Sequence, residues 1–125
     1  YSPRCAAMDP RFAACIAWGA QWDYHETWKK RIDAQFKTSL SVPGHHITWI
    51  LGVDTLDQAL QKLEPFKLDG VMQKMRCPFL LVHGAEDEQI PLEDAQKQFD
   101  ACGSKDKTFR VYTAEELFVP ETHAS

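Results

Sequence analysis

The sequence predicts an α/β protein with a mainly parallel sheet. Three segments have the composition of strands: residues 11–19, 79–82 and 107–112. Helical patterns separate them, and strands alternating with helices are typical of parallel sheets. The stretch between the first two strands, residues 21–76, is far longer than the dozen or so residues that a crossover requires. It predicts a helical cap inserted into the sheet domain.

The composition fits one small globular domain or part of a larger one, with 125 residues, 44% hydrophobic and 26% charged. A net charge of −4 and the lack of a Lys/Arg run argue against nucleic-acid binding. No apolar run approaches the roughly 18 residues of a membrane-spanning helix. No signal peptide is visible, and because the first residue is Tyr1, the true start is expected upstream.

The four cysteines, at positions 5, 15, 77 and 102, form no CxxC pair. We expect reduced, mostly buried thiols in a cytoplasmic protein. The alternative is a zinc site that uses His45 and His46. Adjacent histidines do not share a helix face, however, and no cysteine is near them in the sequence. We therefore expect no metal.

The first element, Tyr1 to Met8, is compatible with a short helix that Pro10 ends, because the residue before a proline is pushed away from helix. Arg11 to Gly19 is favoured as a strand by its length and its flanking proline and glycine, with a buried helix as the competitor. Ala20 to Phe36 is predicted to be an amphipathic helix, because large apolar residues recur at helical spacing. These residues are Trp22, Trp28, Ile32 and Phe36.

The rest of the presumed cap is predicted to hold a loop, Ser39 to Gly44, and three short helices. His45 to Leu51 is mostly apolar. The segment DTLD caps Leu56 to Leu63, and a proline ends that helix. Leu68 to Met75 has an amphipathic pattern.

The second strand, Phe79 to Val82, leads through an acidic turn into another helix, whose first turn tolerates Pro91. One face of this helix carries Leu92, Ala95, Phe99 and Cys102. Gly103 is expected to stop the helix. Lys107 to Tyr112 alternates polar with apolar residues and is predicted to be the last strand.

The acidic turn has the motif Gly84-x-x-Asp87-x-x-x-Pro91. In an open parallel sheet, chemistry gathers at the carboxyl ends of the strands. The glycine permits a sharp turn, the aspartate projects over the sheet edge, and the proline starts the next helix. A carboxylate placed there can accept the Nδ1–H of a histidine and stabilise the imidazolium. The alternative is a turn or helix-capping aspartate without a catalytic role.

Two segments carry a resemblance to the α/β-hydrolases. CPFLLVHGAEDEQIPLEDA is similar to their strand-and-acid segment, in which the position of Asp87 is the triad acid. YSPRCAAMDPRFAACIAWGAQWDYHETW resembles one branch, the fungal hydrolases that shorten polyketides in the pigment (melanin) pathway, which are related to bacterial 2,6-dihydropseudooxynicotine hydrolases and FrsA-type esterases. The resemblance runs from Tyr1 to about Glu116. It implies the C-terminal part of an α/β-hydrolase sheet with a helical cap insertion.

The resemblance also implies how the chain is divided. Residues 1–20 would be the helix after the nucleophile elbow and a sheet strand, and residues 21–76 the cap. Residues 77–116 would hold a strand, the acid turn, a helix and the last strand, followed by a divergent tail, residues 117–125. Because no G-x-S-x-G elbow occurs, the serine nucleophile is expected just upstream of the first residue. Ser2 is not a replacement, since it lacks the strand and glycines of an elbow.

The histidine base of the family would lie just beyond Glu116, in a glycine-rich turn that this tail does not match. His123 is either a substitute base or a solvated terminal histidine. His83, at the end of the second strand, is either satisfied by backbone groups or helps to orient the acidic loop.

Trp22, Asp23 and Tyr24 are candidate substrate-binding residues, with a core role as the alternative for the aromatic side chains. The resemblance implies hydrolysis of a small carbonyl compound, and more finely C–C bond hydrolysis of a polyketide in fungal pigment biosynthesis. It implies no cofactor, no nucleic-acid or membrane partner, and a homodimer of the full-length protein.

The 125-residue chain is expected to be inactive by itself, because it lacks a nucleophile and a matching base. An incomplete sheet would leave unpaired edges and exposed apolar surface, so we expect poor solubility or self-association. Two non-enzyme alternatives stay open. One is a binding module, and the other is a non-functional fragment of a gene model.

Overall fold

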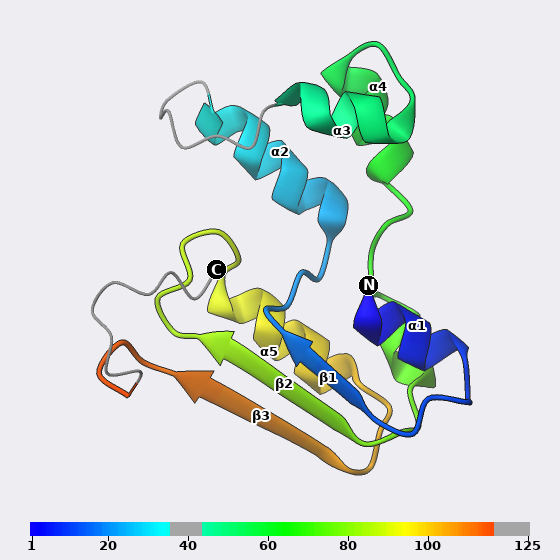
Figure 1. Cartoon of the computed structure of the whole chain (residues 1–125), viewed down its shortest axis with the longest axis vertical. Coiled ribbons are helices and arrows are strands. Elements are labelled where there is room, and N and C mark those ends of the chain that lie inside the picture. The colour runs from blue at the N-terminus through cyan, green and yellow to red at the C-terminus, as the bar shows by residue number, and fades with distance from the viewer. Residues whose placement is uncertain (36–43, 117–125) are drawn as a thin grey trace. The chain divides into compact units, whose positions relative to one another are not determined.

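The computed structural model describes residues 1–35 and 44–116 (Figure 1). It divides into two compact units, Tyr1–Trp22 with Leu68–Ser125, and Asp23–Lys67. The second unit is thus inserted in the sequence of the first. Phe36, most of the predicted loop from Ser39, and the tail with His123 lie outside the described residues.

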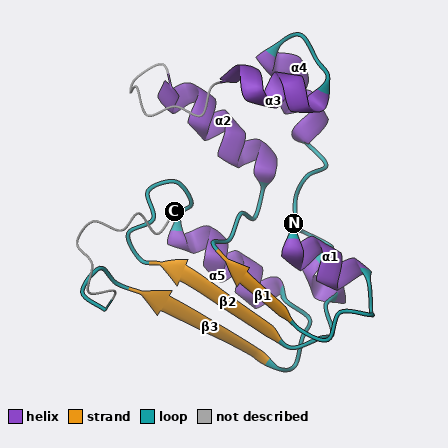
Figure 2. Cartoon of the chain, viewed as in Figure 1, coloured by secondary structure: helices purple, strands orange, loops and turns teal. Residues whose placement is uncertain are grey.

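The first unit is built on a three-stranded sheet of β1 (Cys15–Trp18), β2 (Phe79–Gly84) and β3 (Lys107–Tyr112). The strand order is β1-β2-β3 and both pairings are parallel, so the arrows in Figure 2 point the same way. This confirms the predicted parallel sheet. The strand favoured for Arg11 to Gly19 over a buried helix is also confirmed, although β1 covers only Cys15–Trp18. β2 is two residues longer than predicted, because His83 and Gly84 continue to pair with β3.

One face of this sheet is buried. Along β1 and β2 the burial alternates, so that Cys15, Ala17 and Leu81 point into the core. That core also receives side chains from α1 (Ser2–Met8) and α5 (Leu92–Ala101). Its fully buried members include Met72, Met75, Leu81 and Ala95.

The opposite face of β1 is uncovered. Ile16 is 67% exposed and Trp18 is 73% exposed. Within the described residues, β1 pairs only with β2, so its other edge carries no strand. An open edge beside two large apolar side chains is a surface on which another polypeptide can add a strand.

The prediction of a helix from Leu68 to Met75 is wrong, because most of this segment is not helical. Only a single 3-10 turn forms, η1 (Met72–Lys74). The reason is Gly70, whose φ of +71° introduces a left-handed turn that a regular helix does not contain.

Gly103 follows α5, as predicted, but for a different physical reason. Its φ is not among the positive values, so it does not provide a left-handed helix cap. Instead its backbone N–H donates to the Met72 carbonyl oxygen at 3.0 Å, and a Cβ there would clash with the Gln73 carbonyl oxygen. Glycine is therefore required because the end of α5 and η1 approach each other closely.

The second unit holds three helices: α2 (Tyr24–Gln35), α3 (Gly44–Leu51) and α4 (Leu56–Leu63). They pack around a small core of Trp28, Ile47, Ala59 and Leu63. Thr55, from the predicted capping segment, forms a reciprocal capping box with Gln58.

The helix predicted from Ala20 begins later in the structure, at Tyr24. The Asp23 carboxylate accepts the Glu26 N–H at 3.1 Å, as an N-terminal cap does. Trp22 therefore precedes the helix rather than lying on its face.

We expect the uncovered face of β1 to cause self-association. Trp18→Lys should weaken association at least about ten-fold, because a buried aromatic side chain contributes about 1.5–3 kcal/mol. Sedimentation velocity over a concentration series measures this. Trp49→Lys is the matched control, since Trp49 is 79% exposed but lies on α3 in the other unit. Equal effects of the two substitutions would contradict the assignment.

Burial, reinforced by the nearby thiols of Cys77 and Cys102, raises the pKa of the Cys15 thiol from 9.0 to about 11. The unfolded chain ionises this thiol above pH 9, whereas the folded chain does so near pH 11. The contribution to stability is therefore complete below pH 9 and is lost as the pH rises to about 11. Chemical denaturation should show a smaller loss over this window for Cys15→Ala than for the unchanged chain. Identical pH dependence of the two would refute the effect.

Candidate active site

The acidic turn begins where β2 and β3 end together at the carboxyl edge of the sheet. The Ala85 N–H donates to the Tyr112 carbonyl oxygen at 2.7 Å, which extends the pairing one residue beyond β2. The chain then turns, and the Asp87 N–H lies 3.4 Å from the Gly84 carbonyl oxygen. The parallel register therefore places Asp87 at the edge where α/β sheets carry their chemistry.

The Asp87 carboxylate uses one of its two oxygens to shape this turn. Oδ1 accepts the N–H of Gln89 at 2.9 Å and that of Ile90 at 3.0 Å. The side chain is half-buried, and no hydrogen bond to Oδ2 occurs within the described residues. The turn-forming role is thus real. The second oxygen is not used by this turn, so it stays open to another hydrogen-bond donor.

His83 is the last residue but one of β2 and is only 1% exposed. Its Nε2 donates to the Ile90 carbonyl oxygen at 3.0 Å. Its Nδ1 has no hydrogen-bond partner in the part of the chain that the structure describes. The carbonyl that bonds to Nε2 is a backbone group, as the first interpretation of His83 predicted, and it belongs to the acidic turn; a role in orienting the loop stays a prediction.

Glu86 is a residue of this edge that the sequence reasoning missed. Its carboxylate accepts the Ala114 N–H at 3.1 Å, so it joins the acidic turn to the residues after β3. Glu116 holds the same segment by accepting from Thr113 N–H at 3.2 Å and from Arg110 at 2.8 Å. Because β2 and β3 are neighbours in the sheet, a contact between the segments that follow them could have been predicted. The sequence does not indicate which acidic residue would make it.

The three predicted substrate-binding residues have structural contacts. Trp22 is half-buried against the core of the first unit. In the second unit, Asp23 caps α2 and forms an isolated bridge with Lys67. Tyr24 packs edge-to-face on Trp28, with 6.3 Å between the ring centroids. The core role proposed for the aromatic side chains is therefore present, and substrate binding stays a prediction.

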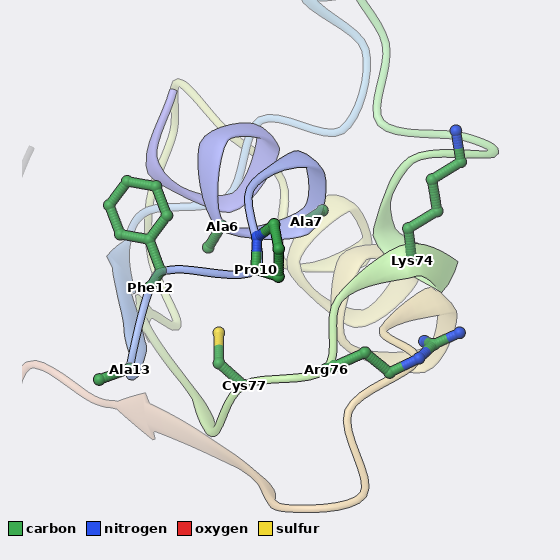
Figure 3. Close-up of a pocket in the computed structure, with 8 residues that line it drawn as sticks. All are labelled: Ala6, Ala7, Pro10, Phe12, Ala13, Lys74, Arg76 and Cys77. Atoms are coloured by element: carbon green, nitrogen blue, oxygen red, sulfur yellow. The ribbon is translucent and has the colours of Figure 1, made fainter.

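A pocket of about 340 Å³ opens elsewhere on the first unit (Figure 3). It lies at the amino ends of β1 and β2, because Ala13 and Cys77 precede those strands. Asp87 follows the carboxyl end of β2, so this pocket does not serve the acid. The lining residues are Ala6, Ala7, Pro10, Phe12, Ala13, Lys74, Arg76 and Cys77.

Among residues 1–35 and 44–116, no three acidic, cysteine or histidine side chains gather as a metal site would require. No helix in the same ranges is long and apolar enough to cross a membrane.

Comparison with known proteins identifies a homologue. No family model matches the chain. It is 33% identical over 95 residues to the 2,6-dihydropseudooxynicotine hydrolase of Paenarthrobacter nicotinovorans, and the match covers 74% of this chain and 23% of that protein. A solved structure of the 2,6-dihydroxy-pseudo-oxynicotine hydrolase superposes with a TM-score of 0.69 and 25% identity, over 89% of this chain and 29% of that one.

The chain thus spans about a quarter of the length of the hydrolases that it matches. The homologue supports a hydrolase relationship but not the fungal pigment branch. The chain is homologous to an α/β-hydrolase, and its parallel sheet with flanking helices is part of the α/β-hydrolase fold.

Proposed function

We propose that this chain carries the acid of a serine hydrolase triad, and that the acid is Asp87. One observation carries the proposal: in a chain homologous to a hydrolase, a half-buried aspartate follows the middle strand at the carboxyl edge and keeps Oδ2 unengaged by the described residues. The two bonds to Oδ1 shape the turn, and Oδ2 at this edge is open to the histidine N–H that a triad acid accepts.

In the proposed reaction, a serine attacks the substrate carbonyl and a histidine accepts the serine proton. Asp87 accepts the histidine Nδ1–H through Oδ2, which fixes the tautomer and stabilises the imidazolium. The histidine then protonates the leaving group, and water hydrolyses the acyl-enzyme by the same route. The serine and histidine would come from parts of the hydrolase fold outside the described residues, so the described part would be inactive by itself. The reaction needs no metal or organic cofactor.

The substrate class is proposed at two levels. The name of the homologue supports hydrolysis of a small carbonyl compound. The resemblance of residues 1–28 to pigment-pathway hydrolases supports a finer proposal, C–C bond hydrolysis of an aromatic polyketide in a fungus. There the leaving group is a carbon that the histidine must protonate as the bond breaks. Trp22, Asp23 and Tyr24 would bind such a flat substrate, in a cytoplasmic protein that acts as a homodimer.

A second candidate is a non-catalytic binding module, and the uncovered face of β1 favours it. Ile16 and Trp18 offer an apolar surface that a partner polypeptide would cover. A non-functional gene-model fragment would expose the same surface.

Transcript reads across the Glu116–Leu117 junction separate these candidates. The hydrolase proposal predicts reads that encode a glycine-rich turn with a histidine soon after Glu116. Reads that encode only the tail LFVPETHAS would support the module or the fragment instead.

Asp87→Asn should lower kcat about 10⁴-fold in the complete gene product, as loss of a triad aspartate does elsewhere. The asparagine oxygen still accepts the N–H groups of Gln89 and Ile90, so the turn should survive. The rate of hydrolysis of an activated aryl ester measures the effect. Glu88→Gln is the matched control, because Glu88 is an exposed acid of the same turn and should leave kcat unchanged. Full kcat in the Asp87→Asn variant would remove Asp87 from the triad.

A further inference from the structure

We propose that His83 is a positioning residue that holds the acidic turn, and with it the Asp87 carboxylate, in place. The inference rests on the proposed role of Asp87 as the triad acid. His83 itself touches no substrate in this account. It acts through Ile90, the residue to which both side chains bond.

Ile90 is held at both of its backbone polar groups. Its N–H donates to Asp87 Oδ1 at 3.0 Å, and its carbonyl oxygen accepts from His83 Nε2 at 3.0 Å. A displacement of Ile90 therefore moves the carboxylate that its N–H orients. His83 is the fixed end of this linkage, because its backbone pairs with Val111 and its ring is buried.

The residue after Ile90 explains why a side chain is needed here. Pro91 has no N–H, so it cannot tie the end of the turn to the sheet by a backbone hydrogen bond. The Pro91 carbonyl oxygen already accepts the Asp94 N–H at 2.9 Å, so the Ile90 carbonyl is the last backbone group before α5 that is left for a bond to the sheet. A histidine at the end of β2 reaches across the turn to that carbonyl, over a separation of seven residues.

The hydrogen bond also fixes the form of the ring. A carbonyl oxygen only accepts, so Nε2 must carry the proton. Nδ1 is buried and has no partner among the described residues, so the contacts of the ring account for one proton, the one on Nε2. That proton is committed to Ile90. His83 is thus a brace for the turn, not a proton shuttle for the reaction.

Two amide substitutions form a matched pair that tests the brace. The side-chain nitrogen of Gln reaches about as far as histidine Nε2, whereas that of Asn reaches only as far as Nδ1. His83→Gln should therefore keep the bond to Ile90, and His83→Asn should lose it. The readout is amide hydrogen exchange by NMR at the Ile90 N–H, which donates to Asp87, in the 125-residue chain at a concentration where sedimentation velocity shows it to be monomeric.

We expect His83→Asn to speed exchange at Ile90 about ten-fold, the effect of losing one partly buried hydrogen bond of typical strength. Exchange at Leu81, in the core of the same strand, reports global stability and should change much less. His83→Gln should leave the exchange rate at Ile90 close to that of the unsubstituted chain. Equal acceleration at Ile90 and Leu81, or equal rates in the H83Q and H83N variants, would overturn the proposal.

The unsubstituted chain offers a second test that does not depend on how a variant folds. Long-range proton–nitrogen NMR correlations distinguish the two imidazole tautomers, and the brace requires the proton on Nε2. A proton on Nδ1 would overturn it.

Neither readout involves catalysis. If Asp87→Asn left activity intact while both NMR results held, the proposed function would fail and the brace would stand as an element of the fold.

Discussion

Parallel pairing of β2 with a strand on each side is the constraint on which the rest of the site depends. It brings the carboxyl ends of all three strands to one edge. It also extends β2 until Gly84 lies opposite Tyr112, so the acidic turn starts where β3 ends. Two hydrogen bonds then join the acidic turn to the end of β3 and the residues that follow it. They run from Ala85 N–H to the Tyr112 carbonyl oxygen and from Ala114 N–H to the Glu86 carboxylate.

Within that edge, the two oxygens of Asp87 would allow it to shape the turn and also to serve as the proposed triad acid. Oδ1 is occupied by two backbone N–H groups and fixes the orientation of the carboxylate. Oδ2 is thereby aimed without being engaged by a described residue. If a histidine donates to Oδ2, as proposed, a carboxylate that is already held in place needs little reorganisation to stabilise the imidazolium, which is the electrostatic advantage of a preorganised site.

Patterns that depend on local physics were predicted well from the sequence. The alternation of Lys107 to Tyr112 predicted the bounds of β3, and the capping signal predicted those of α4. The position of Asp87 beyond a buried strand followed from its motif.

Features set by contacts between distant segments were missed or misread. Gly103 is required by the approach of η1, which its local sequence does not reveal. The helical pattern from Leu68 was misread for a local reason instead, because Gly70 adopts a left-handed conformation. The partner of His83 lies seven residues away across a turn whose path depends on tertiary structure.

The most direct test of Asp87 as the triad acid is a distance in a crystal structure of the complete gene product. It is the separation between Asp87 Oδ2 and the nearest histidine Nδ1. We predict a hydrogen bond of roughly 2.6–3.2 Å, with the other nitrogen of that ring facing a serine Oγ. An Oδ2 that faces solvent, while a serine and histidine pair with a different acid, would contradict it.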